Sequence, residues 1–258
     1  MTNFVSFEKK MEVDKENWFE EWFDSEHYHL LYKHRDYREA ELFITNLFKH
    51  LNLSTSSKVL DLACGKGRHA LQVHQLGFPV LGVDLSDESI QYAKEFTTSG
   101  LDFKRADMRD LGMQQEVDLV LNLFTSFGYF QKEGDNRKVL ESVSRALKPG
   151  GLMVLDYLNV SKVKNLLPQN EQVDRGEVQF NIKKSLEGKF IVKHIHFEDP
   201  SGAHNYQEFV KCIDYSLFIQ YFKSVGMEIV ETFGNYDLDP FDEKNSDRLI
   251  LVVKKIAD

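Results

Sequence analysis

The spacing of hydrophobic residues divides the chain into regions of different period. Residues 1–55 carry apolar side chains at three- and four-residue steps, as on one face of a helix, and predict N-terminal helices. From Ser57 onwards, short apolar runs alternate with helical segments. The runs predict strands at 58–63, 80–84, 101–106, 117–124 and 152–158, with helices between them at 67–77, 87–96 and 134–147. This alternation is typical of an α/β fold with a parallel sheet and right-handed crossovers.

Beyond Asn159 the pattern changes to alternating apolar and polar residues, which is typical of antiparallel strands. Residues 177–184, 189–197 and 205–213 predict a three-stranded ribbon, and a helix over 214–225 and strands over 227–233 and 248–254 follow. We therefore expect one domain, 1–258, whose parts are a helical cap over 1–56, a core over 57–160, the ribbon as an inserted lid over 161–213, and the end of the core sheet over 214–258.

Composition narrows the range of partners and locations. The chain has 32 Lys and Arg against 41 Asp and Glu, and its formal charge of −9 disfavours a nucleic-acid substrate. No apolar run is long enough to span a bilayer, and the charged N-terminus lacks the apolar segment of a secretory signal. The two cysteines, Cys64 and Cys212, fit a reducing compartment. We expect a cytoplasmic protein that acts away from membranes.

The first predicted strand leads into a glycine-rich turn that ends at Gly67. Glycine lets the backbone approach a ligand closely, and the N-terminus of the following helix attracts an anionic group. Gly65, Gly67 and Ala70 also satisfy the dinucleotide-binding fingerprint. The turn alone therefore admits two interpretations, a nicotinamide-dependent oxidoreductase and a methyltransferase.

Three acidic residues at strand ends distinguish these interpretations. Asp61 would face the pyrophosphate of a dinucleotide, a repulsive arrangement, but it can serve the ammonium group of an amino acid. Asp84 ends the next strand, where a carboxylate can accept both ribose hydroxyls of either ligand. Asp107 follows the third strand, where it can accept from an adenine amino group while Met108 packs on the ring. Together they form a negative crevice that suits a sulfonium cation.

These motifs give the chain a specific resemblance. Residues 59–70, 82–86, 106–109 and 148–151 resemble the class I S-adenosylmethionine-dependent methyltransferases, and the resemblance covers about residues 57–159. It implies a doubly wound, mostly parallel sheet of seven strands, the last of which (248–254) runs antiparallel. It also implies S-adenosylmethionine as the cofactor, held by residues of the strand ends and the turn: Asp61, Ala63, Gly65, Gly67, Asp84, Leu85, Asp107 and Met108.

Two further segments resemble one group of these enzymes. Residues 122–130 are similar to the segment after the fourth strand in bacterial N-methyltransferases that act on amino sugars. Tyr28, Tyr32 and Arg35 resemble the N-terminal segment that those enzymes fold over the cofactor, and the resemblance implies that they contact its methionine moiety. The expected reaction is therefore methyl transfer to a small-molecule acceptor, most simply an amine nitrogen.

The acceptor is expected outside the carboxyl ends of the parallel strands. Asn122 ends the fourth strand and also belongs to the expected cofactor site, and Tyr129 lies in the loop that follows; both are the candidate catalytic residues. Methyl transfer is chiefly a task of proximity and orientation, so an amine acceptor needs no dedicated base. No metal is expected, because the histidine pairs at 27 and 29 and at 194 and 196 lack a third ligand.

Several alternatives stay open at this point. The chain can be an NAD-dependent oxidoreductase, a methyltransferase that acts on protein or RNA, or a cofactor-binding module without turnover. The aromatic and histidine side chains of the ribbon fit a cover over the acceptor, and they fit equally a contact between two copies in a homodimer.

Overall fold

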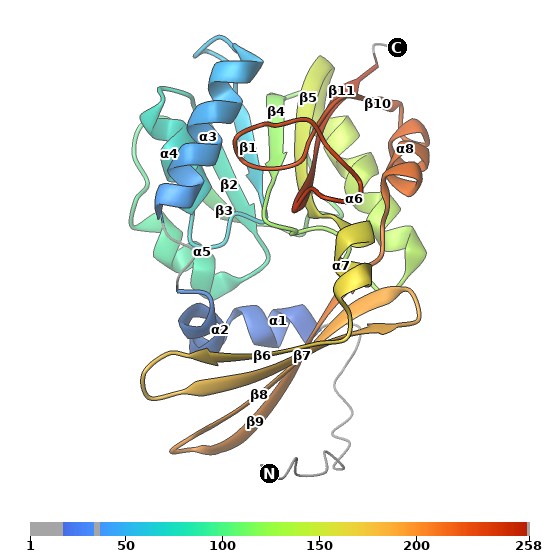
Figure 1. Ribbon diagram of the computed structural model, residues 1–258. Coiled ribbons are helices and arrows are strands. Elements are labelled where there is room, and N and C mark those ends of the chain that lie inside the picture. Colours follow the sequence, from blue (N-terminus) through green and yellow to red (C-terminus); the bar gives the residue numbers. More distant parts are fainter. Residues whose placement is uncertain (1–17, 34–36, 257–258) are drawn as a thin grey trace.

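The computed structural model describes residues 18–33 and 37–256, and its centre is a seven-stranded sheet (Figure 1). The strand order is β10-β11-β5-β4-β1-β2-β3, and β11 runs antiparallel to both of its neighbours. The strands are β1 Val59–Leu62, β2 Val80–Asp84, β3 Leu101–Arg105, β4 Val117–Asn122, β5 Leu147–Leu158, β10 Met227–Phe233 and β11 Arg248–Lys255. The predicted doubly wound α/β sheet with one antiparallel strand is confirmed.

Helices cover both faces of this sheet, because its central strands bury side chains on both sides. In β4, Leu119 and Leu121 pack in one hydrophobic cluster, and Val120 between them packs in the other. The first cluster is covered by α3 Tyr37–Leu51, α4 Arg68–Gln75 and α5 Asp87–Lys94, and the second by α6 Glu133–Ala146 and α8 Tyr215–Lys223. Continuous apolar strands of this kind are typical of a parallel sheet buried on both faces.

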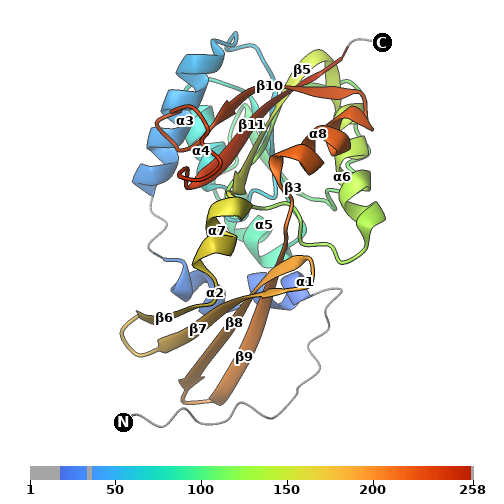
Figure 2. The same cartoon turned by 45° about the vertical axis from the view of Figure 1, so that its right-hand side comes forward.

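A second, antiparallel sheet has one strand more than the sequence pattern predicts (Figure 2). Its strands, in the order β6-β7-β8-β9, are β6 Gln169–Asp174, β7 Gln179–Glu187, β8 Phe190–Asp199 and β9 Gly202–Lys211. The short helix α7 Val160–Leu166 connects it to β5. The edge strand β6 was missed because it is polar and almost entirely exposed, so no apolar alternation marks it.

Two six-residue helices at the N-terminus, α1 Trp18–Phe23 and α2 Glu26–Leu31, lie between the two sheets (Figure 1). Helices of this length are not stable by themselves in water. They are held by the second sheet: the Trp22 ring stacks on Tyr206 at a centroid distance of 4.4 Å, and its Nε1 donates to Glu208 at 2.8 Å. Within the described ranges 18–33 and 37–256, no helix is long and apolar enough to cross a membrane.

Candidate active site

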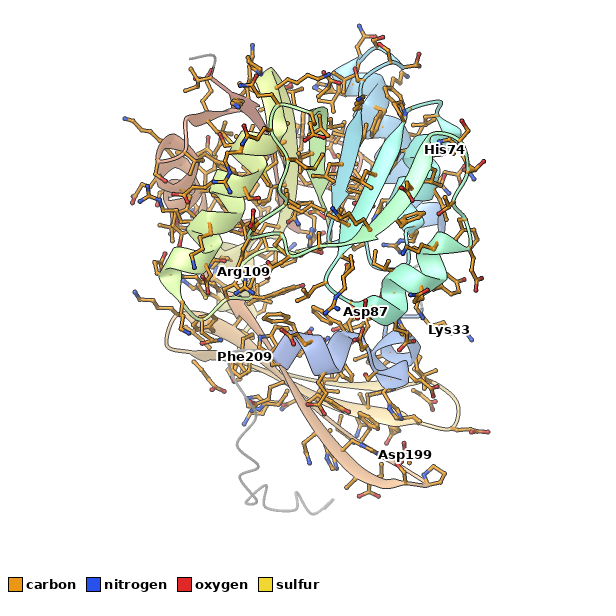
Figure 3. All side chains as sticks on the ribbon, turned by 180° about the vertical axis from the view of Figure 1, so that it is seen from behind. Lys33, His74, Asp87, Arg109, Asp199 and Phe209 are labelled. Atoms are coloured by element: carbon orange, nitrogen blue, oxygen red, sulfur yellow. The ribbon has the colours of Figure 1, made fainter. Side chains whose placement is uncertain are left out.

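A cavity of about 330 Å³ lies at the carboxyl ends of β1, β2, β3 and β4, under α1 and α2. Seen from behind, Asp87 and Arg109 lie on the edge of the core that faces these helices, and Asp199 lies at the far end of the second sheet (Figure 3). One side of the cavity is formed by the strand ends and the glycine-rich turn. The other side is formed by α1, α2 and the loop after β4. The two sides differ in chemistry.

The glycine-rich turn joins β1 to α4. Its two glycines have different structural roles, one at the cavity and one in packing. Gly65 has φ +53°, lines the cavity, and donates its N–H to Asp84 Oδ2 at 2.8 Å. Gly67 has φ +82° and is the N-cap of α4, where a Cβ would stand 2.7 Å from the ring of Phe103. Gly67 is not among the lining residues, so the structure gives it a packing role that lets α4 start close to the sheet.

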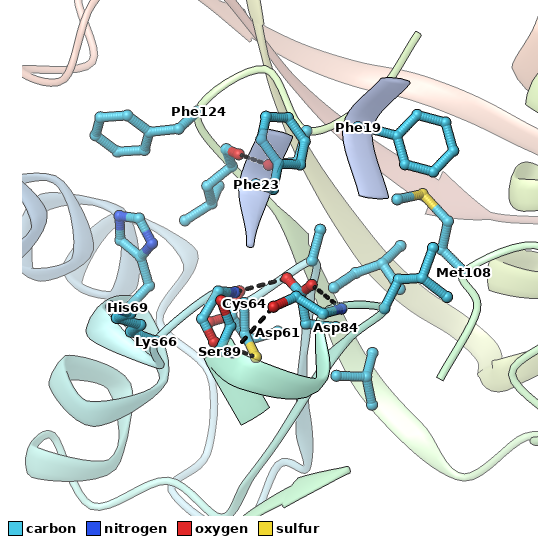
Figure 4. A pocket seen from close by; sticks show the side chains of 18 of the residues that line it. Phe19, Phe23, Asp61, Cys64, Lys66, His69, Asp84, Ser89, Met108 and Phe124 are labelled. Atoms are coloured by element: carbon cyan, nitrogen blue, oxygen red, sulfur yellow. Dashed lines mark hydrogen bonds between the residues drawn. The ribbon is translucent and has the colours of Figure 1, made fainter. Parts of the chain in front are cut away.

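Asp61 presents an unsatisfied buried carboxyl group to the cavity (Figure 4). Its side chain is 2% exposed, and its Oδ2 has no hydrogen-bond partner among the described residues. Burial raises its pKa to about 7, and the nearby charge of Asp84 adds to this, while a backbone hydrogen bond from Ala70 opposes it. A buried carboxyl oxygen without a partner fits a cationic ligand group such as an ammonium.

Asp84 lies beside Asp61 at the end of β2 and is already held by the backbone. Its Oδ1 accepts from Ser86 N–H at 2.9 Å and its Oδ2 from Gly65 N–H at 2.8 Å. Burial raises its pKa, and these two hydrogen bonds oppose the shift. Each carboxylate oxygen has a further lone pair, so the fixed carboxylate can accept two hydroxyl donors, as a ribose provides.

Asp107 and Met108 close this side of the cavity after β3, and Leu85 and Ala63 lie between the acids. The guanidinium of Arg109 binds the Asp107 carboxylate, with Nη2 at 2.6 Å from Oδ2. Burial opposes ionisation of Asp107, but the hydrogen bonds and charge of Arg109 prevail and lower its pKa. Asp107 is therefore an ionised, partnered group, unlike Asp61.

The opposite side of the cavity is aromatic. Phe23 of α1 packs against Tyr28 of α2 at 4.8 Å and against Tyr129 of the β4 loop at 5.4 Å between ring centroids. Phe19 packs against Phe130 of the same loop at 5.7 Å. These contacts join the N-terminal helices to the loop after β4. Ring faces of this kind attract cations and exclude water from the cavity.

Two histidines also line the cavity, and both are neutral. Burial lowers the pKa of His29 to about 4, and the charge of Lys66 adds to this. His29 Nε2 is buried and has no hydrogen-bond partner among the described residues. Burial lowers the pKa of His69 to about 3, with Arg68 adding to the effect. At neutral pH both imidazoles have an unprotonated nitrogen.

The structure places most of the expected site residues at this cavity. Those that line it are Tyr28, Tyr32, Asp61, Ala63, Gly65, Asp84, Leu85, Asp107, Met108 and Tyr129. Arg35 lies outside the described residues. Asn122 is fully buried behind the cavity, where its Nδ2 donates to the carbonyl of Leu62 at 3.1 Å and ties β4 to β1.

Other lining residues were not expected from the sequence. They include Phe19, Phe23, His29, Lys66, Arg68, His69, Ser89 and Phe130. Their positions in the chain carry little signal, although His69 and Arg68 directly follow the glycine-rich turn. Among the described residues, no lining residue comes from the second sheet. This sheet contacts α1 through Glu208 and Trp22, and it contacts the loop after β4 through the Lys211 N–H, which donates to the Gly128 carbonyl at 2.9 Å.

One histidine of each pair contacts an acidic side chain. His27 Nε2 lies 2.9 Å from Asp199 Oδ2, and His194 Nε2 lies 2.7 Å from Glu187 Oε1. In the part of the chain that the structure describes, no group of three or more His, Cys, Asp or Glu side chains is arranged to hold a metal ion.

The fold and the cavity define the class of S-adenosylmethionine-dependent methyltransferases. Residues 53–209 match the sequence model of the methyltransferase domain family, and the chain belongs to this family. The predicted methyltransferase class and the predicted cofactor, S-adenosylmethionine, are thereby confirmed. The nicotinamide alternative is excluded.

Similar proteins include two relatives of different coverage. The Bacillus subtilis (strain 168) protein YqeM is 30% identical over 148 residues, which are 56% of this chain and 60% of YqeM. The chain thus matches less than two thirds of that relative's length. The glycine/sarcosine N-methyltransferase of Aphanothece halophytica is 27% identical over 260 residues, covering 93% of this chain and 89% of that enzyme.

Two solved structures share the fold. An S-adenosylmethionine-dependent methyltransferase from Clostridium acetobutylicum ATCC 824 superposes with a TM-score of 0.73 at 23% identity, covering 86% of this chain and 93% of that chain. The amino pentose methyltransferase CalS10 from Micromonospora echinaspora superposes with a TM-score of 0.62 at 19% identity, covering 90% and 97%.

Proposed function

We propose that this chain transfers the methyl group of S-adenosylmethionine to an amine nitrogen of a small-molecule acceptor. The observation that carries the proposal is a cavity with an acidic side and an aromatic side, under α1 and α2. A cavity of about 330 Å³ has the size of small-ligand sites.

The acidic side fits the cofactor group by group. We assign Asp61, with its unsatisfied Oδ2, to the ammonium of the methionine moiety. Asp84 is assigned to the ribose hydroxyls, and Met108 with Leu85 to the faces of the adenine. Tyr28 of α2 and Tyr32, which ends this helix, line the same cavity and complete the set.

The aromatic side is assigned to the acceptor. When bound, the cofactor supplies an electrophilic methyl group on a sulfonium. Tyr129 and Phe23 exclude water and orient the acceptor nitrogen, which must be in line with the bond that breaks. The amine attacks in its neutral form, and His29 is not assigned as its base, because a pKa of about 4 makes the imidazole a weak proton acceptor.

The relatives support nitrogen as the acceptor atom. The name of the Aphanothece halophytica relative states N-methylation of two small amines, glycine and sarcosine, and that relative is similar over almost the whole chain. The free cysteines Cys64 and Cys212 fit a reducing compartment, and a cytoplasmic location is part of the proposal.

The test is turnover of S-adenosylmethionine to S-adenosylhomocysteine with a panel of small acceptors. The panel contains glycine, sarcosine, amino sugars and matched alcohols in which a hydroxyl replaces the amine. We expect turnover with one or more amines and none with the matched alcohols. Turnover with alcohols alone, or tight cofactor binding without turnover on any acceptor, would contradict the proposal.

A further inference from the structure

The loop after β4 contains two consecutive non-glycine residues in the left-handed region, Phe124 with φ +58° and Thr125 with φ +62°. L-residues adopt this conformation only when the surrounding structure imposes it. Phe124 lines the cavity, so the strained turn forms part of the active-site wall. The question is which residues hold it.

One buried residue, Asp156 on β5, binds the turn through both its carboxylate and its backbone carbonyl. Phe124 N–H donates to Asp156 Oδ2 at 2.9 Å, and Thr125 N–H donates to the Asp156 carbonyl at 2.9 Å. The Asp156 side chain is 0% exposed and does not line the cavity. The carboxylate and the carbonyl of Asp156 thus accept from the two N–H groups that the left-handed turn exposes.

Arg248, at the start of β11, completes the arrangement from the neighbouring strand. Its Nε donates to Asp156 Oδ1 at 2.7 Å, and its Nη2 donates to Thr125 Oγ1 at 2.8 Å. Tyr236, in the connection between β10 and β11, donates its hydroxyl to Asp156 Oδ2 at 3.1 Å. The guanidinium thus binds the carboxylate and the turn at once, a geometry for which its fixed fork is suited.

This left-handed turn positions the Phe124 ring against charged and titratable groups of the cavity. The Phe124 ring lies 5.0 Å from the His69 ring, tilted by 32°, and 5.4 Å from the Tyr236 ring. The Arg68 guanidinium stands over the same ring at 4.6 Å from its centroid. A displaced turn would therefore displace the Phe124 ring, which lies beside His69 (Figure 4) and over which the Arg68 guanidinium stands.

We propose that Asp156 and Arg248 are positioning residues of the active site, which hold the left-handed turn at Phe124 and Thr125 and thereby fix His69 and Arg68. This inference rests on the proposed function for its effect on catalysis. Its effect on the turn is independent of any substrate. Neither residue touches the cavity, so neither is a catalytic residue.

The test compares Asp156→Asn and Arg248→Lys with a matched control, Asp118→Asn. Asp118 also lies on the central sheet, pairs with Lys148 at 2.8 Å and accepts from Lys58 N–H at 2.8 Å, but it is at the amino end of β4, away from the cavity. Arg248→Lys keeps the positive charge beside Asp156 and removes the fork that also reaches Thr125, so it carries the test if Asp156→Asn does not fold.

Two readouts are measured on folded protein well below its melting temperature. The first is the NMR resonance of the His69 ring, which the Phe124 ring current shifts and which reports the turn without any substrate. The second is kcat/KM with the best amine acceptor. We expect both variants to move the His69 resonance and to lower kcat/KM by about 100-fold, the usual effect of misplacing a site by an ångström. The control should leave both readouts unchanged.

A rescue variant separates positioning from general support of the fold. Adding Thr125→Gly to Asp156→Asn removes the cost of the left-handed backbone at position 125, while Phe124 keeps its positive φ and Arg248 loses the Thr125 hydroxyl, so kcat/KM should recover in part. An unchanged His69 resonance and unchanged kcat/KM in both single variants would overturn the inference, and so would effects equal to those of Asp118→Asn. If the wild type turns over no amine, the proposed function fails, and the His69 resonance still decides the inference.

Discussion

The two sides of the cavity are built in different ways. The acidic side consists of Asp61, Asp84 and Asp107, each at or just beyond the end of a parallel strand, where the register of the sheet fixes its position. The aromatic side consists of two six-residue helices and a loop, which meet through side-chain contacts such as that of Phe23 with Tyr129. Under the proposed assignment, cofactor chemistry is encoded by local motifs, and acceptor chemistry by contacts between distant segments.

The two sides also differ in the structure that supports them. Asp61 and Asp84 lie in strands of the central sheet, and Asp107 lies just beyond β3. Asp61 Oδ2 is buried and has no hydrogen-bond partner among the described residues. The helices of the second side rest on the antiparallel sheet through Trp22 and Glu208. Substitutions on the first side should change cofactor affinity or the stability of the fold. Substitutions on the second side should have smaller effects, because they change how firmly α1 and α2 are held over the cavity.

The largest effect should come from Asp84→Ala, which removes the acceptor assigned to both ribose hydroxyls. Two hydrogen bonds to a charged group contribute about 4 kcal/mol, so the Kd of S-adenosylmethionine should rise roughly 1000-fold by calorimetry. Asp87→Ala is the control, because Asp87 starts α5, pairs with Arg105 at the surface and does not line the cavity. Equal affinity in the Asp84 variant and the wild type would refute the assignment.

The next effect concerns the rigidity of the first side. Gly67→Ala places a Cβ 2.7 Å from the Phe103 ring at φ +82° and should lower the free energy of unfolding by about 3 kcal/mol. Gly188→Ala shares a positive φ, +59°, but its Cβ would meet open space. Denaturant unfolding of both variants isolates the steric part. A Gly67 variant no less stable than the Gly188 variant would contradict this packing role.

A pH effect tests the charge state of Asp61. Its pKa of about 7 means that the free protein holds a largely protonated carboxyl below pH 7, and an ammonium ligand binds the ionised form. The affinity for S-adenosylmethionine should therefore rise as pH increases toward 7 and level off above it, with up to about tenfold loss per pH unit below.

Calorimetry between pH 5.5 and 8 measures this dependence. His29 and His69 do not contribute, because their pKa values of about 4 and about 3 keep them neutral throughout this range. Asp61→Asn should bind weakly with a shallower slope, because burial also raises the pKa of Asp84. A wild-type affinity that is flat across the range would exclude Asp61 as the partner of the ammonium.

The smallest effect should come from the contacts that hold α1 and α2 on the second sheet. Glu208 accepts from Trp22 Nε1 at 2.8 Å and from the Tyr32 hydroxyl at 2.7 Å, and Lys193 Nζ lies 3.7 Å from its Oε2. Glu208→Gln weakens these contacts by about 1 kcal/mol, so the Kd of the cofactor should rise about fivefold with little change in global stability.

Tryptophan fluorescence of the Glu208 variant should also change, because it perturbs the surroundings of Trp22. Glu187→Gln serves as the control on the same sheet, where Glu187 contacts His194 at the surface. If Glu208→Gln weakens binding as strongly as Asp84→Ala does, the distinction between the two sides is wrong.

What the sequence predicts follows the same division. The strands, the glycine-rich turn and the three acids were predictable because apolar periodicity and a short motif determine them locally. Strand β6 was not, since its residues are polar and exposed, and its pairing with β7 gives it order. The boundaries of β5 also differ, because the strand was predicted to start at residue 152 and starts at Leu147.

The remaining site residues depend on tertiary contacts. Asn122 sits at a strand end, as an active-site residue would, but its side chain turns into the core toward Leu62. His29 reaches the cavity because α2 is held on the second sheet, a contact more than a hundred residues away in the chain. No periodicity records such contacts. Tyr129 as a catalytic residue stays a prediction, because lining the cavity does not test its chemistry.

The attachment of α1 and α2 to the antiparallel sheet has a consequence for protein engineering. Two six-residue helices cannot order themselves, so residues 18–31 and 169–211 behave as one exchangeable unit although over 130 residues separate them. A chimera that receives only the inserted sheet of a relative would lose the surface on which Trp22 and Tyr32 rest. Under the proposed assignment of the acceptor to the aromatic side, we expect that changing the acceptor range requires transplanting both segments together, while the strands and the glycine-rich turn stay untouched.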